Sequence, residues 1–334
     1  MMKILRMTAL LAFCAYEFSF AAYLSQELFI INWGEEPNQL KMEITSISDN
    51  STPDDPYDDE VTAGAGPSDA FVDADGNIIF SSYEFGQLKG FDSQGNLRFD
   101  FSLASPQYNS EIFTGSVAAI YVDGDAHLFV LSAPNNGSVS VVDYNGDIIS
   151  TLYPFLDSSG VTISLLSWSY DGKIFFHDSG RGWRAYLGGD FENWGTPGFL
   201  AMNGSFYAAK AFTLDAKTPT DSIKFNKYES PDSTGVAHSR ELKTIIYPSM
   251  NLYSASLLNA LDGSFLYNFV CVDDYSSFEV WVHDLDYEVK FRIELEAVDE
   301  DLGWFIPPFV SSDGSIYEFR SLNDGLHVVK WTKE

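Results

Sequence analysis

The sequence predicts an all-β fold built from repeated four-stranded antiparallel units, on two observations. Asp-Gly or Asn-Gly pairs recur between short apolar runs, and such a pair is among the strongest short-range signals of a β-hairpin. Beyond the N-terminal segment, no convincing run of apolar residues has the spacing of a helix. Short strands joined by Gly and Asn turns are typical of an all-β domain.

Residues 66–103 show the repeated unit most clearly. Four short apolar runs are separated by turn residues, with Asp75-Gly76 between the first two and Gly95-Asn96 before the fourth. Four consecutive antiparallel strands form one blade of a β-propeller, and a repeat of roughly 40–50 residues is typical of that architecture. The turn signal recurs at Asp123-Gly124, Asp171-Gly172, Asn203-Gly204, Asp262-Gly263 and Asp313-Gly314. We therefore predict a six-bladed β-propeller of four-stranded antiparallel blades.

Residues 1–22 have the features of a secretory signal peptide. A basic start is followed by an apolar run, Met7 to Tyr16, that is too short to span a bilayer, and Ser19-Phe20-Ala21 fits a cleavage site. A lipid anchor on Cys14 is not expected, because lipoprotein signals have a small residue where this chain has Phe13. We expect a secreted or periplasmic protein with no membrane span.

Residues 23–334 are expected to form a single propeller domain. The last unit supplies only three strand-like runs, whereas the run at residues 28–33 precedes the first unit and belongs to none. Since a circular array must join its first and last blades or leave edges exposed, we expect this N-terminal strand to pair beside Leu326 to Trp331 and complete the last blade. Residues 41–65 are predicted to be a long connection that contains an acidic loop at 53–60.

Charge and cysteine content exclude several classes of function. The chain has 48 acidic and 19 basic residues, a formal net charge of −29 that repels phosphate backbones, so nucleic-acid binding is excluded. After removal of the signal peptide only Cys271 remains, which allows no disulfide within the chain. Its apolar neighbours predict a buried cysteine in a strand.

The sequence contains no recognisable catalytic, metal or cofactor motif. The five histidines show no HExxH or other close zinc spacing, and no Gly-x-Ser-x-Gly elbow or phosphate-binding glycine loop occurs. Asp73-Ala74-Asp75-Gly76-Asn77 imitates the start of a calcium loop, but Ile78 stands where such a loop needs glycine, so a hairpin turn explains it. We predict no catalytic residue, no metal site and no cofactor.

One cluster stands out as a candidate ligand site. It combines planar cationic and aromatic side chains that could stack on a sugar or hold a carboxylate. Its members are Arg181, Trp183, Arg184, Tyr186 and Trp194. The alternative is that the aromatic residues pack between blades and the arginines offset the local acidity.

Several segments resemble secreted bacterial six-bladed propellers of the NHL-repeat type. The resemblance lies in Trp33-Gly34, in Gly66-Pro67-Ser68 leading to Asp73 through Ile78, and in Phe91 through Leu97. It implies a fold and no particular activity, because this fold hosts binding scaffolds, lactonases, lyases and sensors. Gluconolactonase-like propellers carry a metal-binding Glu just ahead of a Gly-Pro pair, and here Ala65 occupies that place.

The sequence therefore favours a secreted non-enzymatic binding or scaffold protein, expected to be a monomer with a protein, peptide or glycan ligand. The alternative is a metal-dependent, lactonase-like hydrolase or lyase that uses carboxylates around the central channel. A third hypothesis is a structural module of the cell envelope.

Overall fold

The computed structural model describes the chain in segments separated by gaps. The described ranges are 23–48, 60–67, 69–73, 75–82, 85–102, 117–122, 128–132, 139–152, 163–168, 174–178, 182–187, 190–193, 199–200, 206–211, 220–228, 239–248, 250–259, 265–272, 277–284, 286–296 and 306–334. Within these ranges the ordered elements are all strands, as predicted, and none is a helix. The predicted signal peptide and residues 53–59 of the acidic loop lie outside them.

Three sheets have four antiparallel strands that are consecutive in the chain. The first contains β4 (Asp69–Val72), β5 (Ile78–Ser82), β6 (Gln87–Phe91) and β7 (Leu97–Ser102). The second contains β8 (Val117–Val122), β9 (Leu128–Ser132), β10 (Val139–Val142) and β11 (Ile148–Leu152). The third contains β12 (Ile163–Trp168), β13 (Ile174–Asp178), β14 (Gly182–Leu187) and β15 (Asp190–Asn193).

The next two predicted units share one eight-stranded sheet, because β17 pairs with β20 through Lys210 and Ser256. This sheet differs from the separate four-stranded units expected there. Its strands are β16 (Phe199–Leu200), β17 (Phe206–Ala211), β18 (Ser222–Tyr228), β19 (Ser239–Ile246), β20 (Leu252–Asn259), β21 (Phe265–Val272), β22 (Ser277–Asp284) and β23 (Val289–Glu294).

The last sheet joins the two ends of the described chain. It contains β24 (Ile306–Val310), β25 (Ile316–Leu322) and β26 (Gly325–Lys333), with β1 (Tyr23–Ile31) as its outermost strand. The predicted pairing of the N-terminal strand with the last strand is confirmed, from Tyr23 opposite Lys333 to Ile31 opposite Leu326. The strand begins five residues earlier than predicted and contains an irregularity between Glu27 and Phe29.

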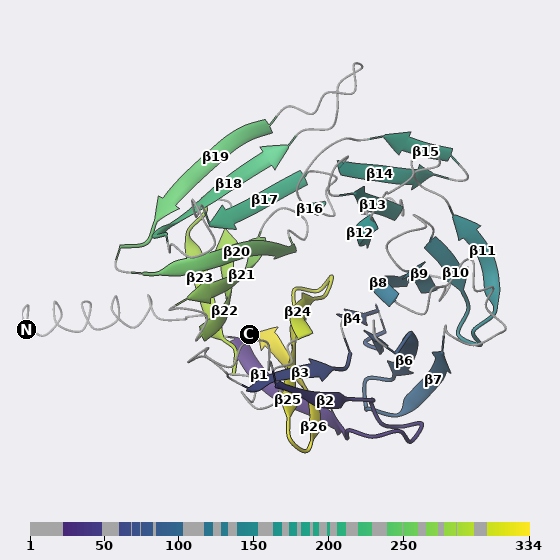
Figure 1. The fold of residues 1–334 in the computed structure, drawn as a ribbon. Helices are drawn as coiled ribbons and strands as arrows, with labels where there is room; N and C mark the ends of the chain where they lie inside the picture. The colour runs from purple at the N-terminus through teal and green to yellow at the C-terminus, as the bar shows by residue number, and fades with distance from the viewer. Residues whose placement is uncertain are drawn as a thin grey trace, which may run out of the picture.

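The sheets are arranged around a common centre, as in a β-propeller (Figure 1). The first strand of one sheet lies beside the first strand of the next, so that β4 contacts both β8 and β24. Hydrophobic side chains fill the space on both sides of the β24–β1 sheet. Those between the β24–β1 sheet and the β4–β7 sheet include Ile31, Val72, Phe80, Phe319 and Val328, each at most 4% exposed. Cys271 is buried in β21, as expected.

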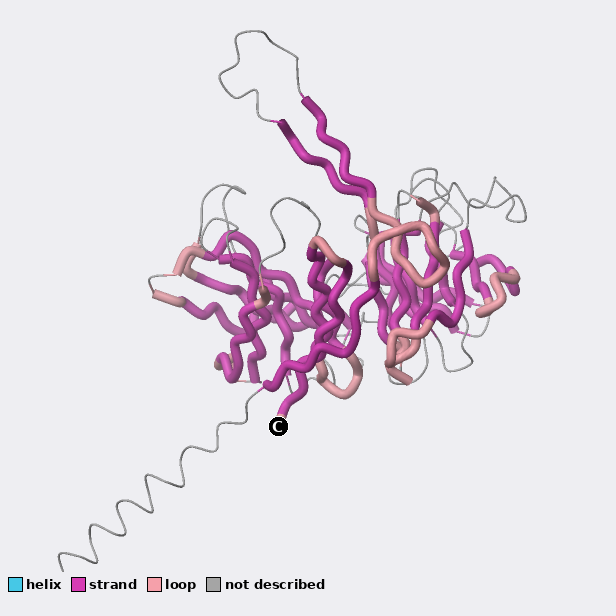
Figure 2. The backbone as a smooth tube through the Cα atoms, turned by 90° about the horizontal axis from the view of Figure 1, so that it is seen from below, coloured by secondary structure: helices cyan, strands magenta, loops and turns pink. Residues whose placement is uncertain are grey.

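The predicted long connection at residues 41–65 is wrong in part, because it contains a hairpin. β2 (Glu43–Ser48) and β3 (Glu60–Ala65) pair in register from Glu43 opposite Ala65 to Ser48 opposite Glu60. Among the described strands they pair only with each other. Figure 2 shows this hairpin projecting away from the other sheets. Both runs contain β-branched residues, Ile44, Thr45 and Ile47 in β2 and Val61 and Thr62 in β3, which favour the extended conformation.

Five described hairpins share one five-residue turn, at residues 73–77, 92–96, 143–147, 284–288 and 311–315. The backbone N–H of the first residue donates to the carbonyl of the fifth, and the N–H of the fourth donates to the carbonyl of the first. In four of them the first residue is an aspartate whose carboxylate accepts the N–H groups of the third and fifth residues. The fourth residue has a positive φ and is glycine in four copies and Tyr287 in the other. This is a three-residue-loop hairpin with a glycine bulge.

Candidate functional site

The predicted ligand cluster lies only partly in the described chain. Trp183, Arg184 and Tyr186 belong to β14, opposite His177, Phe176 and Ile174 of β13. Because faces alternate along a strand, position 183 lies on the opposite face of the sheet from positions 184 and 186. Arg181 and Trp194 lie outside the described residues. The structure thus places the three described members on two faces, and the ligand site stays a prediction.

A different residue, Asp69, has the properties expected of a reacting group. It begins β4, the strand that contacts the first strands of both neighbouring sheets. Its carboxylate accepts the N–H of Ala70 at 2.9 Å, and burial raises its pKa to about 7 against that hydrogen bond. A carboxyl group that titrates near neutral pH can both give and take a proton under ordinary conditions.

Two serines of β5 lie opposite this end of β4. Ser81 is the register partner of Asp69, and Ser82 follows it and donates a hydrogen bond from its Oγ to the carbonyl oxygen of Gly66 at 2.9 Å. Both serines are buried. Because faces alternate along a strand, Ser81 shares the face of Asp69 and Ser82 lies on the other face. We call Asp69 and Ser81 the inner-strand site. The sequence analysis missed it, because Gly66-Pro67-Ser68-Asp69 has the composition of a turn.

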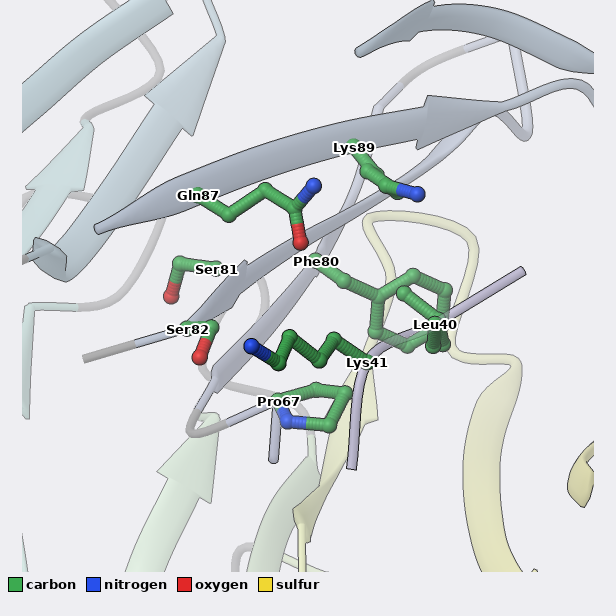
Figure 3. Close-up of a pocket in the computed structure, with 8 residues that line it drawn as sticks. All are labelled: Leu40, Lys41, Pro67, Phe80, Ser81, Ser82, Gln87 and Lys89. Carbon is green, nitrogen blue, oxygen red and sulfur yellow. The ribbon is translucent and has the colours of Figure 1, made fainter. Parts of the chain in front are cut away.

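A small space adjoins the two serines, and Figure 3 shows the side chains around it, among them Pro67, Phe80 and Lys41. Its volume of about 10 Å³ is enough for roughly one water molecule. At its edge Lys89 is 2% exposed and lies 3.1 Å from a carboxylate oxygen of Asp100. Its ammonium group also donates to the carbonyl groups of Glu36, Pro37 and Gln39, so it fastens the 34–40 turn to β6.

A larger hollow of about 290 Å³ lies between the β4–β5 turn and the β24–β25 turn. Its lining includes Asp73, Asp75, Asp313 and Lys330. Two of these carboxylates already hold the turns, because Asp73 accepts the N–H groups of Asp75 and Asn77, and Asp313 accepts that of Ser315. The acidity of this hollow is therefore explained by turn structure.

The alternative hypothesis of the sequence analysis required metal ligands. Within the described ranges, no three His, Cys, Asp or Glu side chains come together in a group that could hold a metal ion. The described residues therefore do not fit a metal centre, and no step of a reaction is assigned to a metal here. Nor does the described chain contain a helix long and apolar enough to cross a bilayer.

One of the described histidines, His283, lies in the protein interior. His283 is fully buried, and its ring nitrogens contact the hydroxyl of Tyr247 and the amide of Asn268, both at 2.9 Å. Burial lowers the pKa of His283 to about 4, so it is neutral at neutral pH. His127 and His238 lie outside the described residues.

Neither a family model nor a curated protein sequence matches the chain. Among solved structures, it is similar to virginiamycin B lyase from Staphylococcus aureus, with 10% identity, a TM-score of 0.43, and coverage of 87% of this chain and 88% of that one. Regucalcin from Agrobacterium tumefaciens, described as a calcium-binding protein, matches with 11% identity, a TM-score of 0.45, and coverage of 79% and 88%. A luciferin-regenerating enzyme matches with 11% identity, a TM-score of 0.43, and coverage of 80% and 91%.

These names correct one prediction. A lyase and a luciferin-regenerating enzyme are catalysts, so these findings contradict the predicted non-enzymatic binding or scaffold protein, and the enzymatic alternative is the hypothesis that remains to be proposed. At such low identities and TM-scores the matches assign neither a reaction nor a ligand to this chain.

Proposed function

We propose that the protein is a hydrolase or lyase whose proton-transferring group is Asp69. The observation that supports this most directly is the position of a carboxyl group at the start of β4, beside the first strands of two other sheets. Among the described residues, the N–H of Ala70 donates to its carboxylate, whereas a turn aspartate such as Asp92 accepts two backbone N–H groups. A carboxyl group so weakly stabilised as an anion is suited to exchange protons with a substrate.

The two reaction classes use the same group in different ways. In a hydrolysis, the Asp69 carboxylate would take a proton from the attacking water while the bond to the leaving group breaks. In an elimination, it would take a proton from carbon, and the electron pair of that C–H bond would form the double bond. The leaving group would depart from the adjacent carbon with the electron pair of its own bond. In both cases the protonated acid can then return the proton to the leaving group.

The finer features of the architecture belong to the same proposal. We infer a six-bladed ring of the NHL-repeat type, closed by β1 as the outer strand of the last blade. Support comes from the β1–β26 pairing and from the three described sheets of four consecutive strands. The single domain at 23–334, secretion after removal of residues 1–22, and the monomeric state remain parts of this proposal.

The test compares Asp69→Asn with Asp75→Asn in the mature chain. Lactones, esters, peptides and uronic-acid glycans are offered as substrates, with and without calcium or zinc, across a pH series. We expect turnover with an inflection near the pKa of Asp69, a loss of about 10²–10⁴-fold in Asp69→Asn, and little change in Asp75→Asn at the far end of β4. Asp75 is exposed, so its substitution controls for loss of charge.

A direct titration keeps the proposal falsifiable if no substrate in the panel reacts. The carboxyl carbon of Asp69, followed by NMR, should titrate about three pH units above the ordinary value of 3.8. Titration near 3.8, or full turnover by Asp69→Asn, would exclude Asp69 as the reacting group.

A further inference from the structure

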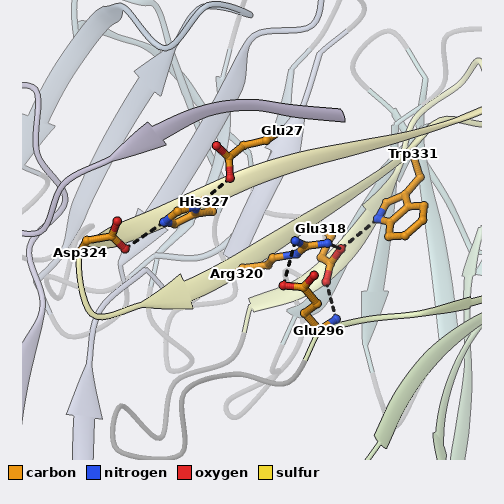
Figure 4. Close-up of polar contacts among 7 residues, drawn as sticks. All are labelled: Glu27, Glu296, Glu318, Arg320, Asp324, His327 and Trp331. Carbon is orange, nitrogen blue, oxygen red and sulfur yellow. Dashed lines mark hydrogen bonds and ion pairs between the residues drawn. The ribbon is translucent and has the colours of Figure 1, made fainter. Parts of the chain in front are cut away.

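The first and last strands of the described chain are joined by a histidine held between two carboxylates. His327 of β26 lies 2.8 Å through Nδ1 from Glu27 of β1, and 2.9 Å through Nε2 from Asp324 in the β25–β26 turn (Figure 4). His327 is 9% exposed, while the Glu27 and Asp324 side chains are 51% and 68% exposed. We call these three residues the His327 clip.

The geometry of the clip specifies its protonation state. A carboxylate accepts hydrogen bonds and donates none, and a neutral imidazole has only one N–H. Both short contacts can therefore be hydrogen bonds only when the ring is the doubly protonated imidazolium. Loss of its proton leaves a ring lone pair facing a carboxylate oxygen, so one of the two contacts becomes repulsive.

The other charged groups around the ring are balanced among themselves. Arg320 is the register partner of His327 on β25, so its side chain lies on the same face of the sheet. Its guanidinium is held at 3.0 Å by Glu318 and by Glu296, which follows β23 (Figure 4). Glu318 also accepts a hydrogen bond from the indole of Trp331. Arg320 is thus neutralised by its own two carboxylates, and Glu27 and Asp324 are left to His327.

The clip lies where β1 has few other side-chain contacts. Residues 24–27 are exposed, whereas Leu28, Phe29 and Ile31 pack against the core beyond the irregularity in the strand. Before the clip, the Tyr23 side chain contacts Gly314, Tyr267 and Phe291. The first half of β1 therefore depends on backbone pairing, Tyr23 and the clip.

We propose that the His327 clip is a pH-dependent interaction between β1 and β26. It holds residues 23–27 of β1 against β26 when His327 is protonated, and this part of β1 becomes less tightly held when His327 loses its proton. This goes beyond the proposed enzymatic function and does not rest on it. It gives the N-terminal strand two states, distinguished by one proton, at the seam between the two ends of the chain.

The direction of the pH dependence follows from the contacts. Burial of the ring works against the charge, but the hydrogen bonds to Glu27 and Asp324 outweigh it, so the pKa of His327 is raised above its usual 6.5. The contact with His327 lowers the pKa of Asp324, so that carboxylate stays ionised well into acid. A raised folded-state pKa makes the clip fully effective below about pH 6.5 and progressively lost as the pH rises through the folded value.

Two measurements on the full mature chain test this proposal. Nitrogen-15 spectra of the imidazole should show both nitrogens of His327 protonated near pH 6, with a midpoint above 6.5. Amide hydrogen exchange, corrected for its intrinsic pH dependence, should show protection of residues 24–27 falling several-fold between about pH 6 and pH 9, since each unit of pKa shift is worth a factor of ten. Amides of β25 opposite β26 should change much less.

Two variants separate the clip from a general effect of charge. His327→Gln should remove the pH dependence of β1 protection and leave it constantly low, and Glu27→Gln should lower the midpoint of the His327 titration. The matched control is Glu294→Gln, an exposed glutamate on the outermost strand β23, which should behave as the parent protein. A midpoint at or below 6.5, a singly protonated ring at pH 6, or unchanged pH dependence in His327→Gln would overturn the proposal.

Discussion

The two ends of strand β4 carry the same residue type in opposite situations. Asp73, just after the strand, accepts two backbone N–H groups, the side-chain amide of Asn77 at 2.7 Å and the hydroxyl of Tyr144 at 3.3 Å. Asp69, at the start of the strand, accepts the N–H of Ala70. One carboxylate holds a hairpin through several donors, and the other has one donor among the described residues.

The turn aspartates show what a carboxylate gains from a full set of donors. Hydrogen bonds from the side chain and backbone of Asn96 lower the pKa of Asp92, and those from Asp147 and Asn145 lower the pKa of Asp143. In Asp69, by contrast, burial raises the pKa, and only the smaller effect of the hydrogen bond from the Ala70 N–H opposes it. The difference teaches that the turn aspartates stabilise the fold, whereas the burial of Asp69 has an energetic cost at neutral pH, which is why we propose a role for it in proton transfer.

The largest expected loss of folding stability comes from replacing a turn glycine that lies close to another strand. Gly76 and Gly95 hold the same turn position, with φ of +79° and +83°. A Cβ at position 95 would lie 2.7 Å from the ring of Phe29 in β1, whereas one at position 76 would lie 3.6 Å from Ser93. Gly95→Ala should therefore cost about 2–5 kcal/mol, from the positive φ and the clash together. Gly76→Ala should cost about 1–2 kcal/mol, from φ alone.

Urea unfolding of the two variants measures this difference directly. Gly76→Ala serves as the control for the backbone term, because its new methyl group makes only ordinary contact. Equal losses in the two variants would show that Phe29 moves aside without cost and that β1 is held loosely at this point.

The second prediction tests the other end of β4. Asp69→Asn should stabilise the protein at neutral pH, because the neutral amide avoids the burial of a charge. A shift from 3.8 to about 7 corresponds to an upper limit of about 4 kcal/mol, and part of the side chain reaches solvent, so we expect about 1–3 kcal/mol. Because the folded pKa is raised, the gain should be complete above about pH 7 and vanish towards pH 4. Unfolding experiments across this range would contradict the prediction if the variant were less stable at pH 8.

The sequence predicted the all-β fold and the β1–β26 seam because both follow from local signals. Hairpin turns carry their own residues, and an unassigned apolar run at one end of the chain has few places to pair. A more informative turn signal than the Asp-Gly or Asn-Gly pair is the aspartate three residues before the glycine, as in Asp73 and Gly76. This aspartate also explains a turn that contains no glycine. That turn has Tyr287 at a φ of 64°, held by Asp284.

The inner-strand site could not be predicted because its properties come from other parts of the chain. Asp69 has an elevated pKa only where neighbouring sheets exclude water, and nothing local distinguishes it from the turn aspartates. The His327 clip joins residues 300 positions apart, so its protonation depends on a partner that no local pattern identifies. The β17–β20 pairing that merges two sheets has the same origin in tertiary contact.

The smallest expected effect measures what one turn aspartate contributes. Asp92 accepts the N–H groups of Gln94 and Asn96, each at 2.9 Å, near the surface where water can replace it. Asp92→Ala should therefore destabilise the protein by about 1 kcal/mol at neutral pH. Gln94→Ala, in the exposed third position of the same turn, should change stability by less than about 0.5 kcal/mol.

Since the folded pKa of Asp92 is lowered, its contribution is present above about pH 3.8 and is lost as the pH falls through the folded value. Thermal unfolding at pH 7 and pH 3 should thus show a difference between Asp92→Ala and the parent protein that narrows in acid, and a difference that widens there would mean that the carboxylate is not what holds the turn.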